Sequence, residues 1–165
     1  FKLARVENVV WFGGLFPQTL VSLVLPNHYN IFDTSQFKGP GDLTFLYQYC
    51  SLVGLALAIY AAIGVRDRRA APLGILAVFG VCWTLGDKTA PWRWLYPLLP
   101  EKVRIGIHPE YAYCILTLSI AGLAAVGLGR LRLRDSVRWA IAAAIALDLF
   151  LVGAGRPMNV VAVQS

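Results

Sequence analysis

The sequence predicts an all-α polytopic integral membrane protein, in which a single membrane domain, residues 1–165, contains four transmembrane helices plus one interfacial or re-entrant helix. Three observations lead to this fold class. Hydrophobic residues make up 58% of the chain and charged residues only 15%, whereas a soluble domain has about 25% charged residues. The mean hydropathy is +0.61. The uncharged residues form long runs separated by short arginine clusters, which is typical of membrane helices and their loops.

The first apolar stretch, residues 9–26, is predicted to lie at the outer membrane interface. Gly13, Gly14 and Pro17 interrupt it. The unbroken remainder, about eight residues, would cover only about 12 Å as a helix, against a bilayer core of about 30 Å. An interfacial or re-entrant segment therefore fits best, and a full span is the alternative. A polar outer loop rich in Pro and Gly, residues 27–42, follows this segment.

The four predicted spans are charge-free runs, apart from one acidic residue. Residues 43–65 form the first span, with 23 residues that lack a charge. Residues 70–86 form the second, which tolerates a proline in its first turn because the missing N–H has no helical partner there. Residues 111–129 and 139–155 form the third and fourth spans, and Asp148 interrupts only the fourth.

Small residues recur at every fourth position along two of the predicted spans. This spacing places them on one helix face, which allows another helix to approach closely. The two stripes are Gly54, Ala58 and Ala62 in the first span, and Ala121, Ala125 and Gly129 in the third.

The distribution of basic residues predicts the orientation. The short loops 66–69 and 130–138 hold seven arginines in 13 residues, whereas the longer loops 27–42 and 86–110 hold five Lys or Arg in 41. By the positive-inside rule the short loops are cytoplasmic and the long loops and both termini face outward. The net charge of +6 is therefore explained by arginines in the cytoplasmic loops of a protein whose partner is the lipid bilayer. No nucleic-acid partner is expected.

Few groups in the chain are suited to chemistry. An outward carboxylate can act as a general base, and Lys or Arg can hold a phosphate. The alternative for each such residue is that a loop is polar because it is hydrated. Asp148 differs, since an acid inside a span costs at least ~2.5 kcal/mol unless it has a partner or a wet cavity. It is interpreted as a functional or helix-pairing residue, with Gln48 or Tyr47 as a possible packing partner.

The sequence contains no motif for a cofactor or a metal. The patterns HExxH and CxxC are absent, as are the glycine-rich nucleotide-binding patterns. Cys50, Cys82 and Cys114 all fall in apolar runs without metal-ligand spacing. They are interpreted as small packing residues, and their odd number leaves at least one unpaired.

Two stretches carry a resemblance to a known family. The run LFPQTLVSLVLPNHYNIFDTSQFKGPGDLTFLYQYCSLVGLALAIYAAI resembles the middle of YfhO-type bacterial membrane proteins, with their outward loop and the Tyr-bearing helix after it. The run YPLLPEKVRIGIHPEYAYCILTLSIAGLAAVGLGRL is similar to the next outward loop and helix of that family. Arg104 and Pro109 fit its pattern, whereas Glu110 stands where many members have a second basic residue.

The resemblance implies a glycosyltransferase of the GT-C type in the bacterial cytoplasmic (inner) membrane. Such an enzyme moves a sugar from a polyprenyl-phosphate carrier to an acceptor on the outer face. The presumed catalytic acid of the family lies upstream of the region matched here, so the chain is expected to be a fragment and no catalytic residue is carried over. The implied partners are the polyprenyl-phosphate-linked sugar and further transmembrane helices of the same protein or of a complex.

Under this resemblance the outward loops would cap the reaction site. The acceptor-side candidates are His28, Asp33 and Asp42. The candidates for the carrier phosphate are Lys88, Arg93, Arg104 and His108. Whether the chain is enzymatic stays open, because a non-catalytic multi-pass subunit or scaffold of a larger complex suits four spans without a complete catalytic set equally well. A small transporter is a weaker alternative that depends on Asp148 alone.

Overall fold

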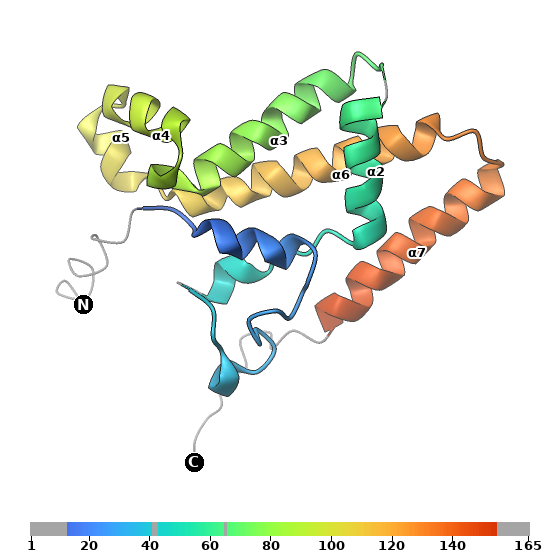
Figure 1. Cartoon of the computed structure of the whole chain (residues 1–165), viewed down its shortest axis with the longest axis horizontal. Coiled ribbons are helices and arrows are strands. Elements are labelled where there is room, and N and C mark those ends of the chain that lie inside the picture. The colour runs from blue at the N-terminus through green and yellow to red at the C-terminus, as the bar shows by residue number, and fades with distance from the viewer. Residues whose placement is uncertain (1–12, 41–42, 65, 155–165) are drawn as a thin grey trace.

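The computed structural model describes residues 13–40, 43–64 and 66–154 (Figure 1). These residues form helices and loops, with no strand among them. The longer helices are α2 (Leu52–Gly64), α3 (Ala70–Thr84), α6 (Tyr113–Arg130) and α7 (Asp135–Ala154). Shorter helical elements are η2 (Pro17–Leu23), η3 (Thr34–Gln36), η4 (Leu43–Leu46), η5 (Gly86–Lys88), α4 (Ala90–Leu95), η6 (Tyr96–Leu98), α5 (Glu101–Gly106) and η7 (Pro109–Ala112).

Helix α6 is the centre of the fold, because it packs against both α2 and α3. Its buried side chains Leu116, Ile120 and Leu123 form one cluster with alanines of the other two helices. Two glycines allow the helices to come this close. A Cβ on Gly127 of α6 would collide with the carbonyl oxygen of Leu57 in α2, and a Cβ on Gly80 of α3 would lie 2.9 Å from the backbone nitrogen of Leu116.

The prediction of one continuous helix over residues 43–65 is wrong in its first part. The chain forms the short 3-10 helix η4, runs without helical structure through residues 47–51, and begins α2 only at Leu52. Ser51 has a φ of +65°, which a continuing right-handed helix excludes. The side chain of Gln48 donates to the carbonyl oxygen of Phe45 at 2.6 Å, so this segment satisfies part of its backbone without a helix.

The other three predicted spans correspond to helices with shifted ends. Two of the described helical stretches, Pro109–Arg130 and Asp135–Ala154, are long and apolar enough to cross a membrane. α2 and α3 have 13 and 15 residues, which gives about 20 and 22 Å and is less than a bilayer core of about 30 Å. α7 begins four residues before position 139, because Asp135 suits the first turn of a helix and accepts from Arg138 at 2.9 Å.

The predicted interfacial stretch, residues 9–26, contains the seven-residue 3-10 helix η2, and residues 9–12 lie outside the described part. The segment before η2 pairs with the end of α3. Leu15 N–H donates to Thr84 O at 2.8 Å, and Asp87 N–H donates to Gly13 O at 3.1 Å. Gly14 and Gly86 both have positive φ, +74° and +58°, and a Cβ on either would meet the opposing backbone within 2.7 Å. Glycine is therefore required on both sides of this contact.

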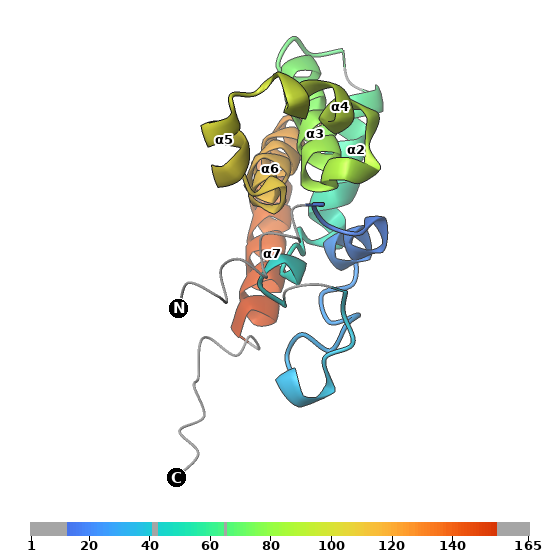
Figure 2. The ribbon, with the colours of Figure 1, turned by 90° about the vertical axis from the view of Figure 1, so that its left-hand side faces the viewer.

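The two arginine-rich connections lie together at one end of the helices. Arg130 at the end of α6 donates to Asp67, in the connection between α2 and α3, with 2.6 Å between Nη2 and Oδ2. Figure 1 shows this end at the right, and α4 and α5 at the opposite end of α3 and α6. Figure 2 shows the loop around η3 well below α4 and α5.

Candidate functional site

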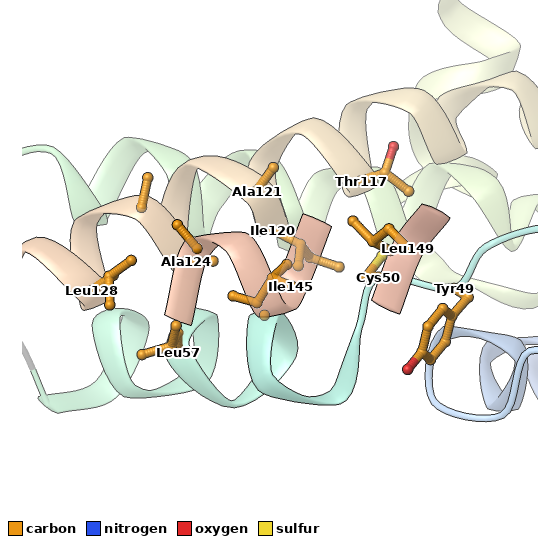
Figure 3. Close-up of a pocket in the computed structure, with 13 residues that line it drawn as sticks. Tyr49, Cys50, Leu57, Thr117, Ile120, Ala121, Ala124, Leu128, Ile145 and Leu149 are labelled. Atoms are coloured by element: carbon orange, nitrogen blue, oxygen red, sulfur yellow. The ribbon is translucent and has the colours of Figure 1, made fainter. Parts of the chain in front are cut away.

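A cavity of about 360 Å³ lies between α2, α6 and α7 (Figure 3). Thirteen residues line it, and ten of these carry only hydrocarbon side chains or are glycine. The lining from α6 runs along one face of that helix, and the lining from α7 has the three- and four-residue spacing of a helix face. The α7 residues are Ala142, Ile145 and Leu149.

The three polar residues of the lining all have partners inside the protein. The hydroxyl of Tyr49 donates to Asp148 Oδ2 at 2.8 Å. The hydroxyl of Thr117 donates to Cys114 O at 3.2 Å, and the thiol of Cys50 lies 3.1 Å from Gln48 O. An apolar ligand in the cavity would therefore leave none of these three groups without a hydrogen bond, which is the condition for binding hydrocarbon without a desolvation penalty.

The Tyr49–Asp148 contact joins the non-helical segment before α2 to α7. The two residues are 99 positions apart in the chain. Asp148 was predicted to be functional or to pair with Gln48 or Tyr47. The structure assigns it a different partner. Gln48 is buried and its Nε2 donates to Phe45 O, whereas the hydroxyl of Tyr47 donates to Ile31 O at 3.0 Å.

Two members of the small-residue stripe of α6, Ala121 and Ala125, line the cavity, and their short side chains leave room for it. The third, Gly129, lies outside the lining and has no neighbouring atom within 4 Å of a Cβ. The close contact with α2 is made instead by the next face of α6, which carries Gly127. The stripe predicted in the first span is partly confirmed, since Gly54 and Ala58 are buried but Ala62 is exposed.

Lys88 and Arg93, two candidates for the carrier phosphate, are brought together around Asp87. Lys88 Nζ donates to the carbonyl oxygens of Gly13 at 2.6 Å and Gly14 at 3.2 Å, and it forms an ion pair with Asp87 Oδ1 at 2.7 Å. Arg93 Nε donates to Asp87 O at 3.0 Å. Lys88 therefore holds the junction between the segment before η2 and the end of α3, and Arg93 ties α4 to η5.

Arg104 and His108, the other two phosphate candidates, lie at and just after α5. The hydroxyl of Tyr96 donates to Arg104 O at 3.2 Å. The Nε atom of Arg104 is buried and has no hydrogen-bond partner among the described residues. The imidazole Nδ1 of His108 lies 3.3 Å from Glu110 Oε1. Of the four candidates, Arg104 is thus the one whose side chain keeps an unused buried donor.

The acceptor-side candidates lie in the loop around η3. His28 is exposed and its ring packs edge-on against Tyr29, with 4.7 Å between centroids. Asp33 caps η3, accepting from Ser35 N–H at 3.0 Å and from the Ser35 hydroxyl at 2.6 Å. These hydrogen bonds hold the pKa of Asp33 below its usual value. Asp42 lies outside the described residues.

Sequence reasoning missed the part of Tyr49 in this site and the cavity itself. The only signal for Tyr49 was that an acid inside an apolar run requires a hydrogen-bonding partner, and that residues 47–51, directly before α2, all carry a side-chain hydroxyl, amide or thiol. The three cysteines are free, and Cys50 forms part of the cavity wall.

Comparisons with known proteins add no relative. No protein-family model matches this chain, and no curated protein or solved structure is significantly similar to it. The resemblance to YfhO-type membrane proteins therefore stays a prediction from the sequence.

Proposed function

We propose that this chain is a multi-pass membrane domain whose cavity between α2, α6 and α7 receives the hydrocarbon tail of a polyprenyl-phosphate-linked sugar. The single observation that carries the proposal is the character of the cavity wall, in which every polar group already has a partner within the protein. Such a wall binds hydrocarbon and offers nothing to a polar substrate. α6 and α7, the helices that supply most of the lining, also belong to the two helical stretches of the described residues that are long and apolar enough to cross a membrane.

The activity proposed for the whole protein is transfer of the sugar to an acceptor on the outer face of a bacterial cytoplasmic membrane, with loops 66–69 and 130–138 on the cytoplasmic side. In this proposal the chain contributes carrier binding, and the catalytic acid comes from elsewhere. Arg104 is the best-suited residue for the carrier phosphate, because no described residue accepts a hydrogen bond from its guanidinium group, and free guanidinium donors form charge-assisted hydrogen bonds to phosphate. Lys88 is less suited, since backbone carbonyls and Asp87 already surround its ammonium group, and Arg93 already gives its Nε to Asp87 O.

Two substitutions on α7 test tail binding with a matched control. Ala142 lines the cavity and its neighbour Ala143 is exposed outside it. Ala142→Phe places a ring in the cavity, whereas Ala143→Phe adds the same ring to the outer surface. We expect the first variant to bind polyprenyl phosphate at least about tenfold more weakly and the second to bind like the wild type. Equal binding by both variants, with unchanged helicity, would refute the proposal.

A second candidate function, a scaffold subunit, is favoured by the exposure of α7. None of its residues is buried within the described part of the chain, and its outward face carries the exposed side chains of Trp139, Leu147 and Phe150. A neighbouring transmembrane helix would cover this face. Two variants, Leu147→Cys and His28→Cys, distinguish the functions when each is treated with a bifunctional crosslinker in native membranes. A discrete crosslinked partner that forms with Leu147→Cys but not with His28→Cys supports the scaffold.

A further inference from the structure

A second hollow, of about 640 Å³, lies at the arginine-rich end of the helices. Four arginines line it from two connections that are far apart in the sequence, Arg66, Arg68 and Arg69 after α2 and Arg130 at the end of α6. Asp67 is the one acidic residue of the lining. The hollow therefore has a strongly positive wall, with four guanidinium groups and one carboxylate.

The carboxylate of Asp67 is already used, so it does not neutralise the remaining arginines. Its Oδ1 accepts from Arg69 N–H at 2.8 Å, and its Oδ2 accepts from Arg130 Nε at 2.9 Å and Nη2 at 2.6 Å. The side chain of Asp67 is 11% exposed. Arg66 and Arg68 are exposed and make no side-chain hydrogen bond or ion pair with another described residue. Asp67 thus fixes one wall of the hollow and leaves the guanidinium groups of Arg66, Arg68 and Arg69 available to an anion, because Arg69 gives only its backbone N–H to Asp67.

The rest of the wall is apolar and belongs to α6. Ala125, Val126 and Gly129 complete the lining of the hollow, and Ala125 also lines the cavity between α2, α6 and α7. An anion that fits this hollow therefore has guanidinium groups on one side and hydrocarbon on the other. A phospholipid headgroup fits both sides, because its phosphate is anionic and the attached acyl chains are hydrocarbon. A free phosphate makes no favourable contact with the apolar side.

We propose that this hollow binds the phosphate headgroup of an anionic phospholipid, with the first carbons of an acyl chain against α6. Guanidinium groups suit phosphate because their donors match its oxygens in pairs, and basic pockets between helix ends are a known form of lipid headgroup site. The inference rests on the membrane placement proposed above but does not require that the protein binds polyprenyl phosphate. The hollow lies at the end of α6 opposite to Thr117, and its ligand is a lipid of the surrounding bilayer.

Native mass spectrometry of the protein in an uncharged detergent tests the proposal, with phosphatidylglycerol and phosphatidylcholine as probes. The test variant is Arg66→Gln/Arg68→Gln. The control is Arg132→Gln/Arg134→Gln, which removes the same charge from exposed arginines that do not line the hollow. We expect the wild type and the control to retain phosphatidylglycerol in preference to phosphatidylcholine. The test variant should bind phosphatidylglycerol at least about tenfold more weakly, because it loses charge-assisted hydrogen bonds to the phosphate.

Two further arms identify the source of the phosphate and separate this site from the carrier site. Inorganic phosphate in excess should not displace the phosphatidylglycerol, and Ala142→Phe should leave its retention unchanged. An equal loss of phosphatidylglycerol binding in both double variants would overturn the proposal, because it would show that the lipid is held by the overall positive charge and not by this hollow. Displacement by inorganic phosphate would overturn it as well, since the occupant would then be a free anion.

Discussion

The hydroxyl of Tyr49 lies 2.8 Å from Oδ2 of Asp148 and donates a hydrogen bond to it. Asp148 is the only charged residue of the apolar run 139–155, where an unpartnered acid would be costly. The bond gives this acid a partner and joins α7 to the segment before α2. Because none of the described residues of α7 is buried, we expect this polar contact to be a main determinant of where α7 lies.

Replacing Tyr49 with Phe tests this determinant. The change removes the donor and leaves the Asp148 carboxylate without its partner, so we expect the free energy of unfolding in detergent to fall by about 1 kcal/mol, the scale of such contacts between membrane helices. Tyr60→Phe on the exposed face of α2 is the matched control and should be neutral. If Tyr49→Phe and Asp148→Leu were additive in a double-mutant cycle, the contact would contribute nothing.

Gly127 and Gly129 on α6 give a second matched pair. Alanine is intrinsically better than glycine in a helix by about 1 kcal/mol. A methyl group at Gly127 would collide with Leu57 O, whereas one at Gly129 meets nothing within 4 Å. We therefore expect Gly127→Ala to destabilise the protein by about 1–3 kcal/mol and Gly129→Ala to be neutral or stabilising, as measured by unfolding in detergent. The same effect from both substitutions would contradict the close contact between α6 and α2.

The sequence allowed the helical class and the approximate positions of α3, α6 and α7 to be predicted. Long runs without charge mark these helices, and arginines mark their ends. The same reasoning failed at residues 47–51, because absence of charge does not distinguish a helix from a non-helical apolar segment. What decides the conformation there is tertiary. Tyr47 bonds to Ile31 O, and Tyr49 bonds to a residue 99 positions away, and neither pairing is visible in local composition.

The candidate site was predictable only in part, for a related reason. The depth of Asp148 in an apolar run indicated that it needs a partner. In the sequence alone, however, several polar residues just before α2 were equally suitable partners. The cavity depends on which face of α6 meets α2. Alanine and glycine recur at neighbouring positions on two faces of that helix, so spacing alone selected the stripe through Ala125 rather than the one through Gly127.

Lys88 gives a prediction that separates a structural role from carrier binding. Lys88→Met removes the donations to Gly13 O and Gly14 O, so we expect a loss of about 1–3 kcal/mol and faster hydrogen exchange at the Leu15 amide, which is bonded to Thr84 O. Lys102→Met, on the exposed surface of α5, is the control. If Lys88→Met weakened binding of polyprenyl phosphate while the exchange at Leu15 stayed unchanged, Lys88 would instead act on the carrier.

The ion pair between Asp67 and Arg130 predicts how stability depends on pH. The backbone N–H of Arg69 and, next, the guanidinium of Arg130 hold the pKa of Asp67 below its ordinary value of 3.8. The ionised carboxylate therefore contributes stability that is fully present above pH 3.8 and is lost as the pH falls through the lowered pKa. We expect the wild type to have a higher Tm than Asp67→Asn near neutral pH, and the difference to shrink on acidification below about pH 4.

Asp135→Asn is the matched control for this experiment, because the Asp135 carboxylate is 86% exposed and its pair with Arg138 is local, i,i+3. Exposed pairs contribute little, so its Tm should follow that of the wild type at every pH. A Tm difference between the wild type and Asp67→Asn that stayed constant down to pH 3 would mean that the charge of Asp67 does not hold the α6 end against the α2–α3 connection. The Tm loss in Asp67→Asn would then come from the changed hydrogen bonds of this side chain and not from its charge, and the arginine-lined hollow would keep its shape without an ion pair.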